Sequence, residues 1–369
     1  MEIHSLSLAR FRNYAELDFQ PLPGMNILLG GNAQGKSGIL EALYLLATSK
    51  SHRTTRDADM IRVGDESARV SVDLERSARP EVSLEVVISR SEKKAVRIDR
   101  VRRDRVSDLI GHLNAVIFSS LDIDMVRGEP SLRRRFMDLE MCQISPQYVY
   151  ALGRYKRVLE QRNNLLKEIK ARKASSEALD VWDTQLSGYG AGVMVKRAEF
   201  AAFLARSASA IYSELTSGGE DLSVVYRPTI ESGEERETAG RLKEALAGRR
   251  DVDVSRGTTT VGPHRDDLAM CMGGLSARDY ASQGQQRSAA VALKLAEIEM
   301  METASGEPPV LLLDDVTAEL DPERRARVIR LAAGRCQTFL TTTRLEELQP
   351  ADLDSAAVFE VRSGKVTPK

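Results

Sequence analysis

One short stretch of the sequence, residues 30–37, constrains the fold more than any other feature. It reads GGNAQGKS, which matches the pattern G-x-x-x-x-G-K-S, and it lies between an apolar run at 25–29 and a helical pattern of apolar residues at 37–46. A strand, a glycine-rich turn and a helix in this order point backbone N–H groups at a helix N-terminus, where they bind phosphate. The stretch therefore predicts a nucleotide-binding α/β core. A chance glycine-rich turn with a surface lysine is the alternative.

Every residue of this loop is a candidate nucleotide ligand. The glycines let the backbone approach the phosphates closely, Lys36 reaches the β- and γ-phosphates, and the hydroxyl of Ser37 binds Mg²⁺. We therefore expect ATP and Mg²⁺ to be held by Gly30, Gly31, Asn32, Ala33, Gln34, Gly35, Lys36 and Ser37.

A second candidate site lies near the other end of the chain, where residues 310–315 read VLLLDD. Four apolar residues followed by two acids indicate a buried parallel strand with carboxylates at its C-terminal end. We expect Asp314 to hold Mg²⁺ together with Ser37, and Asp315 to orient or deprotonate the attacking water, so that Lys36, Asp314 and Asp315 are the catalytic candidates. This pattern is weak alone. Its separation from the glycine-rich loop, about 270 residues, predicts a large insertion between two halves of one ATPase.

Residues 282–287 read SQGQQR and precede a strong helical pattern at 288–300. This stretch resembles the signature motif of the ABC-type ATPases. In that superfamily the motif contacts the γ-phosphate held by a different subunit, so ATP joins a head-to-head dimer. The resemblance implies that Ser282, Gln283, Gly284 and Gln285 complete a nucleotide site in trans. The alternative is that Ser282 only caps the helix.

Two further stretches resemble the same superfamily. Residues 319–322 resemble its D-loop, which makes Asp321 a candidate at the dimer interface. An apolar strand pattern ends at Thr343, where transporter subunits carry a switch histidine. The missing histidine and the length of the insertion favour the chromosome-maintenance and repair branch, although the insertion is too short for the long arms of SMC proteins.

Within that branch the chain resembles the RecF family. The resemblance covers nearly the whole sequence, through residues 6–19, 32–37, 47–53, 126–138, 262–268 and 312–321. It implies that Arg12 and Asn13 also contribute to the nucleotide site. Residues 119–122 read SSLD where the family usually has Ser-Pro-Glu-Asp, which leaves a lid role for this segment open.

The RecF resemblance also implies a function. We expect a slow, DNA-stimulated ATPase that acts as a switch: ATP joins two copies as a clamp on double-stranded or gapped DNA. With RecR and RecO as partners, the clamp would help to load RecA on single-stranded gaps in recombinational gap repair and replication restart.

The fold class that we expect is α/β, an ABC-type P-loop ATPase head with a sheet core and an inserted helical lobe. The core would comprise residues 1–130 and 256–369, and the lobe residues 131–255. Near-heptad apolar spacing from Tyr148 and from Trp182 predicts two long helices joined near 174–176, packed as a short antiparallel coiled-coil-like pair. Alternating patterns at 70–74, 82–88 and 96–98 predict antiparallel strands over one side of the core, and 216–221 and 231–237 are expected to be exposed loops.

Charge gives only local indications of a partner. The net charge is −1, so DNA binding has no support from the whole chain, but three basic clusters stand out. Each is a candidate DNA contact or simply a solvated face. They are Arg154, Lys156, Arg157, Arg162, Lys167, Lys170, Arg172 and Lys173; Arg97, Arg100, Arg102, Arg103 and Arg105; and His52, Arg53 and Arg56.

No apolar run approaches the roughly 20 residues needed to cross a bilayer, so we expect a cytoplasmic protein without a membrane partner. Two other functions stay open at this point. A transporter ATPase subunit would normally carry the switch histidine, and a structural dimerisation protein with a vestigial nucleotide site would lack the pair Asp314 and Asp315.

Overall fold

The structure, a computed structural model, describes residues 1–216, 218–315, 322–332, 334–349, 353 and 356–369. The chain forms two compact units. The core unit comprises residues 1–123 and 287–369, and the inserted unit comprises residues 124–286. The inserted unit extends beyond the expected range 131–255 on both sides, because residues 267–272 pair with a strand at 222–227 inside this unit.

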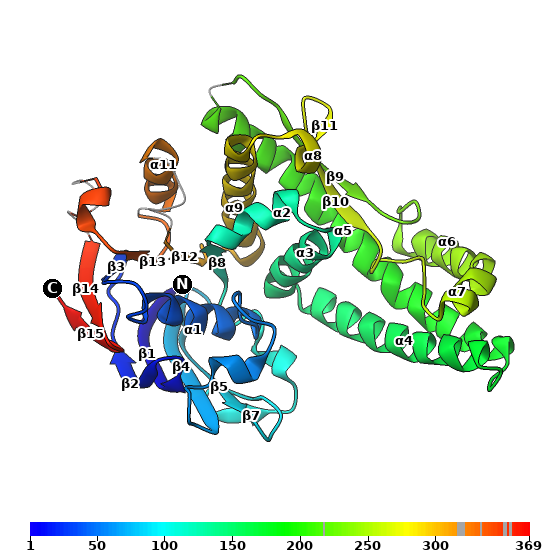
Figure 1. The fold of residues 1–369 in the computed structure, drawn as a ribbon, viewed down its shortest axis with the longest axis horizontal. Coiled ribbons are helices and arrows are strands. Elements are labelled where there is room, and N and C mark those ends of the chain that lie inside the picture. Colours follow the sequence, from blue (N-terminus) through cyan, green and yellow to red (C-terminus); the bar gives the residue numbers. More distant parts are fainter. Residues whose placement is uncertain (217, 316–321, 333, 350–352, 354–355) are drawn as a thin grey trace. The chain divides into compact units, whose positions relative to one another are not determined.

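The central sheet of the core unit is built from both ends of the chain (Figure 1). Its strand order is β15-β14-β3-β13-β12-β8, and all neighbours are parallel except the hairpin of β14 and β15. The inner strands are almost continuously buried, as expected for parallel strands covered on both faces. The strands are β3 (Met25–Leu29), β8 (Ala115–Phe118), β12 (Val310–Leu313), β13 (Thr338–Thr342), β14 (Ala356–Arg362) and β15 (Lys365–Pro368).

Two helices of this region, α1 (Lys36–Thr48) and α9 (Gln283–Ser305), lie where the sequence pattern predicted them, and a third, α11 (Pro322–Ala332), was not predicted. Helix α1 begins at the end of the glycine-rich loop and is buried along almost its whole length. Helix α9 begins at the signature-like stretch, and α11 follows the acidic strand. Short 3-10 turns complete the unit: η1 (Asp57–Met60), η2 (Val106–Leu109), η3 (Ser120–Asp122) and η5 (Leu345–Glu347).

A second, antiparallel sheet of the core unit has the order β2-β1-β4-β5-β6-β7. Buried and exposed residues alternate along β4 and β5, because one face packs on the core and the other meets solvent. The strands expected near 70–74, 82–88 and 96–98 are confirmed as β4, β5 and β6. The six strands are β1 (Glu2–Phe11), β2 (Tyr14–Phe19), β4 (Ser67–Arg76), β5 (Arg79–Ser89), β6 (Ala95–Ile98) and β7 (Val101–Arg103).

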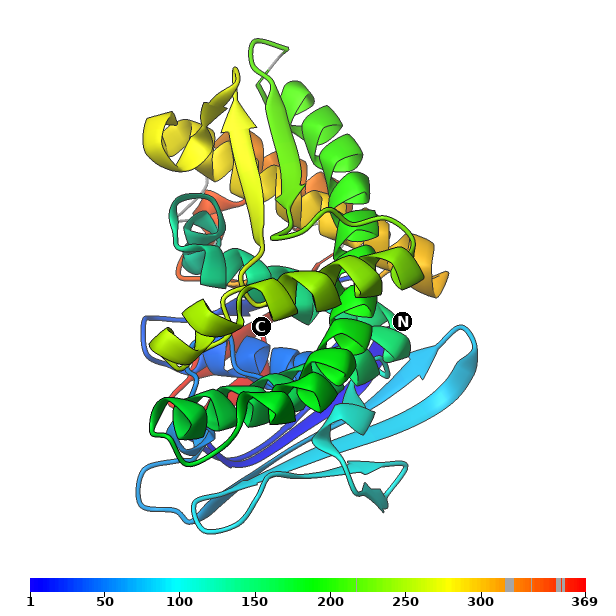
Figure 2. The same cartoon turned by 90° about the vertical axis from the view of Figure 1, so that its right-hand side faces the viewer.

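The inserted unit contains the expected pair of long helices. Helix α4 (Pro146–Lys170) and helix α5 (Leu179–Leu215) pack together and are joined through η4 (Ser176–Ala178), as Figure 2 shows. Residues 216 and 218–221 form a loop as expected, whereas the loop expected at 231–237 is wrong in part because α6 begins at Glu235.

The other elements of the inserted unit complete its core around α5. They are α2 (Ile123–Arg127), α3 (Pro130–Ile144), α6 (Glu235–Gly248), α7 (Arg250–Arg256), α8 (Ala277–Tyr280), β9 (Leu222–Arg227), β10 (Asp267–Met272) and β11 (Leu275–Ser276). Among the helices that the structure describes, none is both long and apolar enough to cross a membrane.

Two of the family-like stretches, 126–138 and 262–268, meet in a buried polar network of the inserted unit. Arg133 binds both carboxylate oxygens of Asp267, at 2.7 and 2.9 Å. Arg197 donates to Asp138 at 2.7 Å and to the carbonyl oxygen of Pro263 at 2.6 Å. Buried charges are stable only when paired in this way. These residues therefore hold α3, α5 and β10 together.

Arg162 does not share the exposed position of most of its neighbours in the basic cluster 154–173. Its side chain is 0% exposed and donates to Asp183 at 2.7 Å and to Asp253 and Thr259 at 2.8 Å each. It faces the interior of the inserted unit, so it does not contribute to a DNA-binding surface. The sequence pattern could not separate it from its neighbours, because charged residues on both faces of a helix give the same local excess.

Replacement of Arg162 by leucine should destabilise the inserted unit by about 3 kcal/mol or more, because two acids would stay buried without their cation. For a unit of this size that corresponds to a fall in Tm of roughly 6–12 °C in thermal denaturation. Lys167→Leu, a change on the exposed side of the same helix, is the matched control and should move Tm little. A similar small shift in both variants would contradict the interior role of Arg162.

Candidate nucleotide-binding site

The loop between β3 and α1 depends on two glycines for different reasons. Gly35 has φ 122°, and a Cβ added there would lie 2.6 Å from the hydroxyl of Tyr14. A Cβ on Gly30 would lie 2.3 Å from the carbonyl oxygen of Val361 on β14. Any side chain at either position therefore forces the backbone away from its neighbours. Both positions expected from the motif carry the glycine that the local packing requires.

Lys36 and Ser37 begin α1 and point toward the sheet edge. The Nζ atom of Lys36 donates to the carbonyl oxygens of Gly30 and Gly31, at 2.6 and 2.9 Å, so the side chain folds back over the loop. Burial lowers the pKa of Lys36, and the nearby charges of Asp315 and Asp314 oppose this shift in part. The hydroxyl of Ser37 donates to Oδ1 of Asp314 at 2.8 Å.

Asp314 directly follows β12, and hydrogen bonds from two hydroxyl groups fix one of its carboxylate oxygens, Oδ1. In addition to the bond from Ser37, Oδ1 accepts a hydrogen bond from the hydroxyl of Thr341 on β13, at 3.1 Å, and Oδ2 faces His52. Burial by itself would raise the pKa of Asp314. The neighbouring His52 and the hydroxyls of Ser37 and Thr341 outweigh burial and hold this pKa below its ordinary value, which favours the carboxylate.

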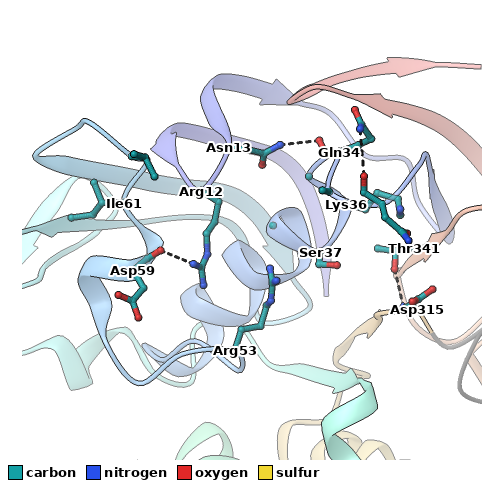
Figure 3. A pocket seen from close by; sticks show the side chains of 15 residues that line it. Arg12, Asn13, Gln34, Lys36, Ser37, Arg53, Asp59, Ile61, Asp315 and Thr341 are labelled. Atoms are coloured by element: carbon teal, nitrogen blue, oxygen red, sulfur yellow. Dashed lines mark hydrogen bonds between the residues drawn. The ribbon is translucent and has the colours of Figure 1, made fainter.

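Asp315 occupies a different environment from Asp314. Its side chain is exposed and lines the pocket, and its backbone N–H donates to the hydroxyl of Thr341 at 2.8 Å (Figure 3). Its φ of 53° lies in the left-handed region, which is uncommon for a residue with a side chain and turns the carboxylate away from the strand direction. Asp314 is thus half-buried and fixed by hydroxyls, whereas Asp315 is open to the pocket.

Lys36, Ser37, Asp315 and Thr341 border a pocket of about 410 Å³. Arg12 and Asn13, which the family resemblance had added, lie on its wall, and Nδ2 of Asn13 donates to the carbonyl oxygen of Gln34 at 2.9 Å (Figure 3). The residues that line the pocket are Arg12, Asn13, Asn32, Ala33, Gln34, Gly35, Lys36, Ser37, Gly38, Arg53, Asp59, Ile61, Val63, Asp315 and Thr341.

Sequence reasoning missed the part of this wall that comes from residues 53–63. Arg12 donates to the carbonyl oxygen of Asp59, which brings this segment beside the loop. The side chain of Ile61 is buried, whereas that of Val63 is 94% exposed. A signal was present in the single polar residue Glu41 within the apolar run 39–46, since a buried carboxylate demands partners. Its partners are Arg12 and Ser51, which border the same segment.

The third basic cluster, His52, Arg53 and Arg56, lies partly at this pocket. The side chain of His52 is only 7% exposed and lies beside Asp314, and Arg53 lines the pocket. Arg53 and Arg56 both have exposed side chains, 48% and 79%, and Arg56 lies 3.7 Å from Asp59. Of the three residues, Arg53 therefore lines the pocket and His52 lies beside Asp314, whereas Arg56 does not line the pocket.

The signature-like stretch lies at the exposed N-terminus of α9. Ser282 and Gln285 form a reciprocal cap: the backbone N–H of Ser282 donates to the side chain of Gln285 at 2.7 Å, and the N–H of Gln285 donates to Oγ of Ser282 at 3.3 Å. Ser282, Gln283 and Gly284 are exposed. The capping role considered from the sequence is therefore present, and it leaves this face open to a second molecule. Asp321 of the D-loop-like stretch lies outside the described residues.

The first comparison with known proteins gives the broad class of the chain, which is that of the RecF/RecN/SMC N terminal domain. Residues 2–367 match the family model described as RecF/RecN/SMC N terminal domain. A crystal structure of the Smc head bound to the C-terminal winged-helix domain of ScpA has a TM-score of 0.57 at 18% identity, covering 100% of this chain and 98% of the other, which shows the shared fold alone.

The similarity to one branch is much stronger. Proteins named DNA replication and repair protein RecF are 40% identical in Geobacillus kaustophilus, over 100% of this chain and 99% of the relative, and 41% identical in Lactobacillus delbrueckii subsp. bulgaricus, over 97% and 95%. A solved structure of the recombination mediator protein RecF-ATP in the RecFOR pathway has a TM-score of 0.93 at 31% identity, covering 100% of this chain and 97% of the other. The chain belongs to the RecF family. The expected family and fold class are confirmed. Membership of this family excludes the alternative that the chain is a transporter ATPase subunit.

Three substitutions should separate the roles within the site. Lys36→Met should weaken ATP binding at least 100-fold, on the order of 3 kcal/mol, because the charge-assisted hydrogen bonds to phosphate can no longer form. Asp315→Asn should bind ATP almost normally and lose turnover, whereas Asp314→Asn should bind more weakly at limiting Mg²⁺. Equilibrium binding and steady-state hydrolysis provide the two measurements. Wild-type hydrolysis by Asp315→Asn would remove that residue from the catalytic role.

Proposed function

We propose that this chain is an ATP-dependent DNA-binding protein of replication and repair, a slow ATPase whose nucleotide joins two copies on DNA. One observation carries the ATPase part of the proposal. The hydroxyl of Ser37 and the carboxylate of Asp314 lie 2.8 Å apart beside Lys36, although 277 positions separate them in the sequence. A protein with a vestigial nucleotide site would not need to keep Lys36, Ser37 and Asp314 together.

The residues present fit ATP with Mg²⁺. A pocket of about 410 Å³ is in the size range of nucleotide-sized sites, and the loop backbone beneath it tolerates no side chain at Gly30 or Gly35. The oxygens of Ser37 and Asp314 are the hard ligands that Mg²⁺ prefers. Bound Mg²⁺ would neutralise charge on the transferred phosphoryl group.

The chain's own groups then divide the work. Lys36, bonded to two loop carbonyls, can exchange them for phosphate oxygens that enter the same space. Asp315 presents its carboxylate to the pocket and would accept a hydrogen bond from the attacking water. Thr341 fixes both acids at once, since its hydroxyl donates to Asp314 and accepts from the N–H of Asp315.

The opposite end of the pocket suits the nucleoside. Asn13 fixes the loop through Gln34, and Arg12 is held by Glu41 and the carbonyl oxygen of Asp59. The exposed side chain of Val63 gives this rim an apolar surface, which a flat purine base would cover. We assign Arg12, Asn13 and Val63 to the ribose and base.

Dimerisation follows from the position of the signature-like stretch. The exposed N-terminus of the long helix α9 presents Ser282 and Gly284 to solvent, and the positive end of a helix dipole favours an anion. We propose that the γ-phosphate held by Lys36 of one copy is this anion for the other copy, with Asp321 at the same interface. Hydrolysis would then release the clamp.

The cellular role is supported by the names of the relatives. Proteins called DNA replication and repair protein RecF align over the whole chain, and a similar structure belongs to the RecFOR pathway. We therefore propose action at double-stranded and gapped DNA in gap repair and replication restart, with RecR and RecO as partners in loading RecA. A protein acting on the chromosome with these partners acts in the cytoplasm.

The exposed face of α4 is the DNA-binding surface that we favour. Arg157, Lys167 and Lys170 lie on the side of this helix that meets solvent, and the basic residues 172 and 173 continue the surface just beyond the helix. Arg154 is half-buried over the ring of Tyr150, and Lys156 is paired with Asp138, so both are weaker candidates. Phosphate neutralisation needs a segregated patch of this kind.

Ser282→Arg should eliminate ATP-dependent dimerisation while ATP binding to the single chain stays within about twofold, because Lys36, Ser37 and Asp314 lie on the other side of the nucleotide. Light scattering with and without ATP measures the first effect and equilibrium binding the second. Ser175→Arg, at another exposed helix-capping serine, is the control and should dimerise normally.

A mixture sharpens this test. Ser282→Arg and Lys36→Met chains can form a heterodimer with one intact composite site, so the mixture should recover hydrolysis that neither variant shows alone. Ser282→Arg protein that dimerises with ATP at wild-type concentrations would contradict the shared site.

Reversing the charges of Arg157, Lys167 and Lys170 to glutamate should weaken DNA binding at least 10-fold. The slope of log affinity against log salt should fall by about one for each phosphate that the variant no longer neutralises. The same change at three exposed arginines of the core unit, Arg100 in the turn before β7 and Arg102 and Arg103 on β7, is the comparison. Unchanged affinity and slope in the first variant would move the DNA-binding surface elsewhere.

A further inference from the structure

His52 is a largely buried histidine of the core unit. It is 7% exposed, yet neither ring nitrogen has a hydrogen-bond partner among the described residues. A buried imidazole carries at least one N–H, and leaving such a donor unbonded costs roughly 1–3 kcal/mol. This cost indicates that His52 has a role beyond filling space in the core.

The atom nearest to the ring indicates the reason. Nε2 of His52 lies 3.8 Å from Oδ2 of Asp314, which is too far for a hydrogen bond. Ser37 and Thr341 both bind the other oxygen, Oδ1. Within the described part of the chain, Oδ2 and the imidazole therefore face each other as an acceptor and a donor that have no hydrogen bond. A movement of about 1 Å by either group would join them at ordinary hydrogen-bond distance.

The segment that carries His52 is fixed in place. Oγ of Ser51 accepts the backbone N–H groups of Arg53 and Thr54, at 2.9 and 3.1 Å, and donates to the buried carboxylate of Glu41. On the other side the ring meets the ring of Tyr44 edge-on, with 5.6 Å between the centroids. Both the backbone and the plane of the imidazole are thus set by α1, the helix that follows the glycine-rich loop.

We propose that His52 is a positioning residue that donates from Nε2 to the free oxygen of Asp314 and so orients this carboxylate for the metal of the bound nucleotide. The proposal rests on the assignment of Asp314 to Mg²⁺. Hydrogen bonds to a ligating carboxylate typically contribute 10- to 100-fold to metal affinity. His52 lies just beyond the end of α1, and the sequence has no histidine after β13 that could take this role.

Two amide substitutions distinguish positioning from packing. Gln places an amide N–H near the position of Nε2, whereas Asn, one methylene shorter, places it near Nδ1 and cannot reach Oδ2. We expect the Mg²⁺ concentration for half-maximal binding of a fluorescent ATP analogue to rise at least 10-fold in His52→Asn. In His52→Gln it should stay within about threefold of wild type. Binding measured in EDTA should be equal in all three proteins.

The possible outcomes are separable. Equal Mg²⁺ dependence in wild type, His52→Asn and His52→Gln would overturn the proposal, as would an equal loss in both variants, which is the signature of packing. Tm values of both variants, compared with His4→Asn at an exposed histidine, report any general loss of stability. A wild-type protein without Mg²⁺-dependent binding would instead refute the proposed nucleotide site itself.

Discussion

The hydrogen bond between Ser37 and Asp314 depends on how the central sheet is assembled, and the rest of the site depends on that bond. The sheet places β13 between β3 and β12, so the loop after β3 and the acids after β12 end at the same edge. Thr341 comes from the strand between them and contacts both acids. Two segments of sequence separated by the whole inserted unit therefore form one wall only because three parallel strands share one register.

A second set of buried charges supports this wall from behind. Glu41 is completely buried on α1, and burial alone would raise its pKa. Hydrogen bonds from Arg12 and Ser51 hold that pKa below its ordinary value, so it stays a carboxylate. Through Arg12 it positions the segment 53–63, and through Ser51 it positions His52. The network therefore links the part of the pocket wall from residues 53–63 to His52, which lies beside Asp314.

Motif spacing and periodicity predicted the parts of the molecule that depend on local sequence. The glycine-rich loop, the acidic strand, the long helices α4 and α5 and the strands β4 to β6 all lie where these patterns indicated. The places of Thr341 and Asp59 at the pocket did not follow from sequence, and His52 was grouped with candidate DNA contacts and not with Asp314, because each of these positions depends on a contact between distant segments. Arg162 shows the converse error: a basic run is visible in sequence, but whether a member faces solvent or Asp183 is decided by tertiary packing.

The most direct test of the central claim, that Ser37 and Asp314 act as one metal-binding unit, is a double-mutant cycle of Ser37→Ala and Asp314→Ala. Mg²⁺-dependent ATP affinity is measured for the wild type, both single variants and the double variant. The account predicts that the double variant binds no more than about twofold more weakly than the worse single variant, a coupling of about 1 kcal/mol or more. Losses that simply add would mean that the two side chains act independently, and would contradict the account.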